Sequence, residues 1–137
     1  MSEQYKVLLK KHGLRITPIR INILNKFDKS IHALSAKDLE NGLDNPDRIT
    51  LYRTIKSFES KGIIHKAVDG TDVVKYALCD HECDENDHHH HHVHFHCDKC
   101  DQTFCVDEIE IPQLRAPTGY KVKNTNIIMD GICESCS

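Results

Sequence analysis

The sequence predicts an α+β protein, with an N-terminal winged helix-turn-helix domain followed by a small C-terminal α/β domain. Apolar residues recur at helical spacing up to Gly62 and then occupy two short runs, which is typical of helices followed by a β-hairpin. Histidine and cysteine are concentrated further on, since residues 79–105 hold 8 of the 11 histidines and 5 of the 7 cysteines. Imidazole and thiolate are ligands that Zn²⁺ and related metals prefer, so we expect metal binding in this stretch.

Capping residues indicate where the expected helices begin. A first short helix is expected over residues 3–11, a second after the N-cap Thr17, and a third after the N-cap Ser35. A fourth helix covers about 48–61, where Gly62 ends it. The residues expected to face the core are Val7, Leu8, Ile19, Ile23, Leu24, Phe27, Leu39, Leu43, Leu51, Ile55 and Phe58.

Two strands are expected after the fourth helix. Residues 63–68 and 73–78 are rich in β-branched side chains, and the four residues between them, Asp-Gly-Thr-Asp, are typical of a hairpin turn. In a winged helix-turn-helix, the second helix of the pair enters the DNA major groove, and here that helix is 48–61. Its polar residues can contact phosphates and bases, although a solvated amphipathic face is the simpler alternative. They are Arg48, Thr50, Tyr52, Arg53 and Lys56.

Charge divides the chain into two unlike halves. Residues 1–78 hold 14 Lys and Arg against 9 Asp and Glu, whereas residues 79–137 hold 4 against 12. A basic half joined to an acidic, Cys/His-rich half indicates a polyanion-binding module attached to a metal module, with ordinary charge scatter as the alternative. The sequence has no apolar run long enough for a membrane span and no secretory signal, so we expect a cytoplasmic protein with reduced thiols.

Two C-x-x-C pairs predict one structural metal site. Cys97 and Cys100 form the first pair, and Cys133 and Cys136 form the second. Four thiolates can close a tetrahedral zinc site with no position left for substrate. Strands are expected beside the pairs, over residues 93–96, 103–106 and 122–132. A redox pair or coincidental surface cysteines are the alternative. We expect zinc, because thiols stay reduced in the cytoplasm and clustered cysteines there are more often metal ligands than disulfides.

Other donors predict a second site that spans both halves. Strand alternation places His92, His94 and His96 on one face. His65, on the first strand of the hairpin, and Cys79, at its end, come from the first half. A site made of His65, Cys79, His92 and His94 would fix the angle between the halves only when the metal is bound, which is how a sensor works. The run from His88 to His91 is interpreted as a metal-collecting loop.

The chain resembles the ferric uptake regulator superfamily of metal-responsive bacterial transcription factors over nearly its whole length. The matching stretches are residues 13–20 (Gly-Leu-Arg-Ile-Thr-Pro-Ile-Arg), 50–55 (Thr-Leu-Tyr-Arg-Thr-Ile), 61–64, the His-rich segment that leads into the first C-x-x-C, and 131–136. The resemblance implies a homodimer with residues 1–79 as the DNA-binding domain, 80–92 as a hinge loop and 93–137 as a metal-binding dimerisation domain. It also implies structural Zn²⁺ on the four cysteines.

The resemblance also implies roles for individual residues. Tyr52 and Arg53 would lie in the major groove, Arg15 would reach an A·T-rich minor groove and Arg20 the backbone of a palindromic operator. Details are most similar to the zinc uptake regulator branch, because the positions of regulatory zinc ligands there correspond to His65, Cys79, His92 and His94. His32 corresponds to a hinge ligand of iron-sensing members and competes with His65. Cys105 and Glu108 are further candidate ligands, whereas Val93 replaces a ligand found in many members, which argues against the family's additional site.

The expected function is a zinc-dependent repressor of metal-uptake genes. An iron- or manganese-sensing regulator, with Fe²⁺ or Mn²⁺ at the regulatory site, is the alternative within the same class. A zinc buffer or metallochaperone that uses the histidine run is the alternative from another class, but it leaves the winged helix without a role. The sequence lacks H-E-x-x-H and the H-x-E partner of a deaminase, so we expect no enzymatic activity.

Overall fold

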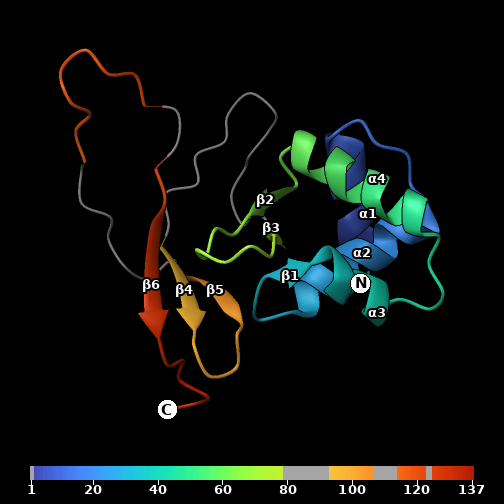
Figure 1. The fold of residues 1–137 in the computed structure, drawn as a ribbon. Coiled ribbons are helices and arrows are strands. Elements are labelled where there is room, and N and C mark those ends of the chain that lie inside the picture. Colours follow the sequence, from blue (N-terminus) through green and yellow to red (C-terminus); the bar gives the residue numbers. More distant parts are fainter. Residues whose placement is uncertain (1, 79–92, 107–113, 123–124) are drawn as a thin grey trace.

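Helices and two small sheets make up the computed structural model, which describes residues 2–78, 93–106, 114–122 and 125–137 (Figure 1). The N-terminal part contains four helices and one three-stranded sheet, and the C-terminal part contains a second three-stranded sheet. Strands β2 and β3 lie between the helices and the C-terminal sheet in Figure 1. The predicted α+β class is confirmed. The predicted domain boundaries and the histidine run lie outside the described residues.

Four helices lie in the described residues, and the second and third begin directly after the predicted caps. They are α1 (Ser2–Lys11), α2 (Pro18–Lys29), α3 (Ala36–Gly42) and α4 (Arg48–Ser60). The Thr17 hydroxyl caps α2 by accepting a hydrogen bond from the backbone of Arg20. Ser35 and Asp38 form a reciprocal capping box at α3, with distances of 3.1 and 3.0 Å. Local hydrogen bonding therefore fixes these helix starts independently of tertiary packing.

One core joins the four helices to the hairpin. Leu9, Ile23, Leu24, Leu51 and Phe58 are fully buried in it. The prediction that Val7 faces inward is wrong, because Val7 is 64% exposed. The inward face of α1 carries Tyr5 and Leu9, one turn apart, and the Tyr5 hydroxyl donates a 2.6 Å hydrogen bond to Asp28 on α2.

The N-terminal sheet contains the predicted hairpin and one strand that the sequence did not predict. The strands are β1 (Leu34–Ser35), β2 (Ile64–Lys66) and β3 (Lys75–Leu78), in the order β1-β3-β2 with antiparallel pairing throughout. His65 lies opposite Ala77 in this register. Both hairpin strands are shorter than predicted, and Val73 and Val74 are half-exposed outside β3.

The central strand of the C-terminal sheet has one antiparallel and one parallel neighbour. Strand β4 (Val93–Cys97) pairs antiparallel with β5 (Thr103–Val106) and parallel with β6 (Ile127–Gly131). The last strand starts later than the predicted residue 122. Strands are the only regular elements among residues 93–106, 114–122 and 125–137. The register sets His94 opposite Cys105 on β5 and His96 opposite Asp130 on β6.

A buried polar network joins the two sheets. Lys75 on β3 lies with its Nζ atom 3.1 Å from Asp69 Oδ2, and it also donates to Thr103 Oγ1 at 3.1 Å and to the Asp101 carbonyl at 2.8 Å. Thr103 also accepts a 2.7 Å backbone hydrogen bond from Ala33. Asp69, Lys75 and Thr103 are each less than a tenth exposed. These contacts place the face of β4 and β5 that carries His94 and Cys105 against the hairpin of β2 and β3, which is the wing of the helix-turn-helix domain.

Candidate metal centres and DNA-binding face

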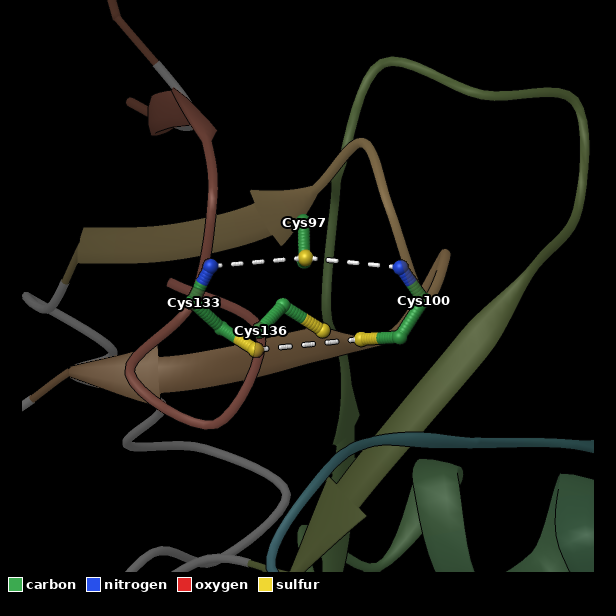
Figure 2. A group of neighbouring side chains, drawn as sticks. All are labelled: Cys97, Cys100, Cys133 and Cys136. Carbon is green, nitrogen blue, oxygen red and sulfur yellow. Dashed lines mark hydrogen bonds between the residues drawn. The ribbon is translucent and has the colours of Figure 1, made fainter.

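The parallel pairing of β4 and β6 brings the two C-x-x-C pairs together. Cys97 is the last residue of β4, opposite Gly131 on β6, and Cys133 follows β6 by two residues. Figure 2 shows the four side chains around a common centre, with Cys97 Sγ accepting hydrogen bonds of 3.4 Å from the backbone N–H groups of Cys100 and Cys133. The predicted set of four cysteines is therefore assembled in space.

The distances between the sulfur atoms suit a tetrahedral ion. All four Sγ atoms of the group lie within 4.8 Å of one another, and Cys100 Sγ is 3.8 Å from Cys133 Sγ. Metal–sulfur bonds of about 2.3 Å in a tetrahedron place the sulfur atoms about 3.8 Å apart. A disulfide would need about 2.05 Å, so these thiols are not bonded to one another. The residues present fit Zn²⁺ with four protein ligands.

The thiols of the group differ in how easily they ionise. Hydrogen bonds from the backbone of Cys100 and Cys133 lower the pKa of Cys97 to about 6. Hydrogen bonding to Cys133 and partial burial raise the pKa of Cys136 to about 12. The pKa of Cys100 is also raised, because burial and the neighbouring thiols outweigh a backbone hydrogen bond from Gln102 that lowers it. Among these three thiols, Cys97 ionises at the lowest pH and so offers a thiolate to a cation most readily.

A second group of donors lies where the wing meets the C-terminal sheet. It consists of His65 on β2, His94 on β4 and Cys105 on β5, with one donor atom from each within 4.8 Å of the others. His65 Nε2 lies 3.8 Å from Cys105 Sγ, and the rings of His65 and His94 are 6.1 Å apart. Both histidines are less than a tenth exposed. Two nitrogen donors and one sulfur donor from both halves thus face one point.

The structure describes only some of the other predicted regulatory ligands. Cys79, His92 and Glu108 lie outside the described residues. His32 is not among the three residues whose donor atoms lie within 4.8 Å of one another; its Nδ1 lies 3.0 Å from the Ala33 carbonyl, and its ring packs edge-on against Phe104. It lines a cavity of about 180 Å³ together with Cys105. The sequence predicts Cys105 as a further candidate ligand, and its place opposite His94 depends on a strand register that the sequence does not reveal.

Helix α4 presents its polar residues on the face opposite the core. Leu51, Thr54, Ile55 and Phe58 form its buried stripe. The residues proposed for DNA contact are exposed, and Tyr52 is 44% exposed. They are Arg48, Thr50, Tyr52, Arg53 and Lys56. Arg48 forms a 2.8 Å ion pair with Glu40 on α3, and the hydroxyl of Thr50 donates to Asp47 at the start of the helix.

Arg15 lies in the segment before α2, and Arg20 lies in the first turn of α2. The side chain of Arg20 donates a 2.7 Å hydrogen bond to the carbonyl of Arg15, whose own side chain is exposed. This bond ties the backbone of the segment before α2 to the first turn of α2. None of the helices in the described ranges is long and apolar enough to cross a bilayer.

A match to a protein family covers most of the chain. The family model described as the ferric uptake regulator family matches residues 11–130. The chain belongs to this family. Members are metal-responsive regulators. This agrees with the assembled cysteine group and with the exposed polar face of α4, the second helix of the helix-turn-helix. The predicted superfamily is therefore confirmed.

Curated relatives carry names that refer to iron. The chain is 33% identical to the ferric uptake regulation protein of Neisseria gonorrhoeae, with 93% of this chain and 90% of the relative covered. It is 31% identical to the ferric uptake regulation protein of Staphylococcus aureus (strain Mu50 / ATCC 700699), with 94% and 93% covered.

Solved structures similar to this chain include regulators of several metals. A zinc uptake regulator in complex with zinc and DNA has a TM-score of 0.66 at 20% identity, with 98% of this chain and 91% of that chain covered. The ferric uptake regulator of Vibrio cholerae has a TM-score of 0.62 at 20% identity, with 93% and 98% covered. At such identities the likeness establishes the shared fold of the ferric uptake regulator family.

Proposed function

We propose that this member of the family is a zinc-dependent transcriptional repressor of metal-uptake genes. It acts in the cytoplasm as a homodimer on a palindromic, A·T-rich operator. The observation that carries the proposal is the group of His65, His94 and Cys105, because its donors come from the wing and from the C-terminal sheet. A metal ion bound to ligands from both halves restricts the position of the wing.

The donor types favour zinc. A thiolate with imidazoles suits Zn²⁺ better than it suits iron(II) or manganese(II), which bind oxygen ligands more readily. The described group supplies three donors, and a tetrahedral ion takes one more, for which Cys79 and His92 are the proposed ligands. His32 and Glu108 are the rival candidates for this fourth position. The four-cysteine site holds a structural Zn²⁺ in this proposal, because all four of its positions are filled by protein.

DNA recognition is proposed for α4 and for the segment before α2. Two copies of α4 reach successive major grooves of a palindrome only when they are about 34 Å apart. Arg48, Thr50, Tyr52 and Arg53 contact the major groove and its phosphates, while Arg15 enters the minor groove and Arg20 contacts the backbone. Bound metal reduces the cost of placing both wings, and a coupling of about 1–3 kcal/mol changes DNA affinity about 5- to 150-fold.

The decisive experiment measures DNA binding with and without the metal between the halves. A palindromic duplex is first selected from a random pool with zinc-loaded protein, and its affinity is then measured by fluorescence anisotropy at fixed salt. We expect His65→Asn to lose the zinc dependence while it keeps one tightly bound zinc at the four cysteines. His12→Asn is the matched control, because His12 lies at the end of α1 outside the group of three and bonds to the Leu8 carbonyl. Equal affinity of the wild type with and without this second zinc would refute the proposal.

An iron- or manganese-responsive regulator is the second candidate. The names of the curated relatives favour it, whereas the sulfur of Cys105 opposes it. Titration of wild type and Cys105→Ser with Zn²⁺, Fe²⁺ and Mn²⁺ separates the two, since loss of a sulfur ligand weakens zinc binding most. A zinc buffer is the candidate from another class, and binding of zinc without any sequence preference for DNA would support it. We propose no catalytic role.

A further inference from the structure

Beside the four-cysteine group lies a separate set of polar side chains that the proposed function does not use. His96 lies on β4, directly opposite Asp130 on β6, and Asp98 and Asp101 lie in the turn that follows β4. One ligand atom from each of His96, Asp98 and Asp130 lies within 4.8 Å of the others. None of these three residues belongs to the predicted structural or regulatory set.

The histidine of this set is buried and held in one orientation. His96 is 8% exposed, and its Nε2 lies 2.6 Å from the carboxylate of Asp101. A carboxylate in this position accepts a hydrogen from Nε2, which leaves the lone pair of a neutral imidazole on Nδ1. The same arrangement orients histidine ligands in many metal sites, where a carboxylate on the far nitrogen fixes the ring and increases its basicity.

The free side of the ring faces two more carboxylates. His96 Nδ1 lies 3.7 Å from Asp98 Oδ1 and 3.8 Å from Asp130 Oδ1, which is longer than a hydrogen bond in both cases. Two ligands of one ion with bonds of about 2.1 Å lie at most about 4.2 Å apart, so one ion can bridge each of these pairs. No lysine or arginine forms an ion pair with these aspartates among the residues that the structure describes.

We propose that His96, Asp98 and Asp130 form a third metal site, with Asp101 as its positioning residue. One nitrogen and two carboxylate oxygens suit a divalent first-row ion with water in the remaining positions, and the oxygen-rich set accepts Mn²⁺ and Fe²⁺. Three carboxylates around one imidazole attract such a cation. The ion would tie β4, β6 and the turn together at a point separate from the wing.

Binding of Mn²⁺ tests the site directly. The protein receives two equivalents of zinc, which occupy the thiolate-containing sites first, and carries His88→Asn to His91→Asn replacements that remove the histidine run as a competing binder. Free Mn²⁺ is then counted by electron paramagnetic resonance during a titration. We expect Asp98→Asn and Asp130→Asn to lose one equivalent of Mn²⁺. The matched control Asp72→Asn, at an exposed position in the hairpin, should keep it.

A second measurement locates the ion without relying on any substitution at the site. Mn²⁺ broadens nuclear resonances near it, so the backbone amide signals of residues 96, 98, 101 and 130 should disappear first in a ¹⁵N–¹H spectrum. Asp101→Asn should weaken Mn²⁺ binding about 10- to 100-fold without abolishing it, as for other outer partners of ligating histidines. Broadening centred elsewhere, or unchanged stoichiometry in Asp98→Asn and Asp130→Asn, would overturn the proposal. A charged His96 ring that only pairs with the aspartates and holds no metal would give the same negative result. Neither a positive nor a negative Mn²⁺ result affects the zinc-dependent DNA binding proposed above.

Discussion

The hydroxyl of Thr103 donates a 2.6 Å hydrogen bond to the carboxylate of Asp69, which joins the C-terminal sheet to the loop between β2 and β3. Both residues are buried, and the Lys75 ammonium lies within 3.1 Å of each. The contact requires no metal, since all three groups satisfy one another. The two halves therefore contact each other here without a metal, and a metal at His65, His94 and Cys105 would add a further connection nearby.

Replacing the hydroxyl of this contact should destabilise the protein. Thr103→Val keeps the shape of the side chain but leaves the Asp69 carboxylate with one hydrogen bond fewer in a buried position, at a cost of about 1–3 kcal/mol. The free energy of unfolding from urea titration measures this, and Thr118→Val, at an exposed position, is the matched control with little expected effect. Equal losses in the two variants would show that the buried network contributes nothing specific.

The same carboxylate should make stability depend on pH at the acidic end. Burial opposes ionisation of Asp69, but hydrogen bonds from Thr103, Thr71 and Lys75 outweigh it and hold the pKa of this carboxyl well below its usual range. A group whose pKa falls on folding contributes stability that is complete above the unfolded value, about 3.9, and is lost as pH falls below it. The difference in unfolding free energy between wild type and Asp69→Asn should be constant from about pH 5 to 7 and shrink below about pH 4. A difference that grows on acidification would contradict this assignment.

Some of these features follow from local sequence and others do not. The helix starts at Thr17 and Ser35 could be predicted because each cap bonds within its own turn. The four-cysteine group could be predicted because two C-x-x-C pairs have few uses other than one shared metal site. The inward face of α1 could not be predicted in the same way. A helix of ten residues has fewer than three turns, which is too few for the apolar spacing to show that Leu9 and not Val7 faces the core. The Asp69–Lys75–Thr103 network was also missed, because a buried lysine in a strand contradicts the usual exposure of lysine. Its partners are 28 and 34 residues apart from Thr103 in the chain.

Zinc binding to the metal-free four-cysteine group should release fewer than four protons at neutral pH. Thiols must ionise to bind zinc, and the pKa values of Cys100 and Cys136 are raised, so both lose protons as the ion binds. Cys97, with a pKa of about 6, is already mostly thiolate at pH 7. Calorimetric titrations in buffers of different ionisation enthalpy count the released protons. Release of four protons per zinc at pH 7 would contradict the low pKa of Cys97.

The exposed face of α4 should contribute to DNA affinity without contributing to stability. Arg53→Ala should weaken binding to a selected operator by about 1–3 kcal/mol if the side chain contacts a base, and should reduce the salt dependence if it contacts a phosphate. Lys37→Ala on α3 is an exposed basic control. Affinities measured at several salt concentrations separate the two cases, and an Arg53→Ala variant that binds as tightly as Lys37→Ala would remove α4 as the recognition element.

Removing the charge of Glu40, which pairs with Arg48, should increase DNA affinity, in contrast to the loss expected for Arg53→Ala. The Arg48 side chain is 72% exposed, so solvent screens its pair with Glu40 and the pair contributes little to the free energy of unfolding. Glu40 holds this arginine through two hydrogen bonds, of 2.8 and 3.1 Å, and also repels phosphate, so it competes with DNA for Arg48. Glu40→Gln should leave the unfolding free energy almost unchanged and should increase DNA affinity several-fold at low salt, an increase that Arg48→Ala in the same chain abolishes. Weaker DNA binding by Glu40→Gln would mean that the pair orients Arg48 for its contact instead of withholding it.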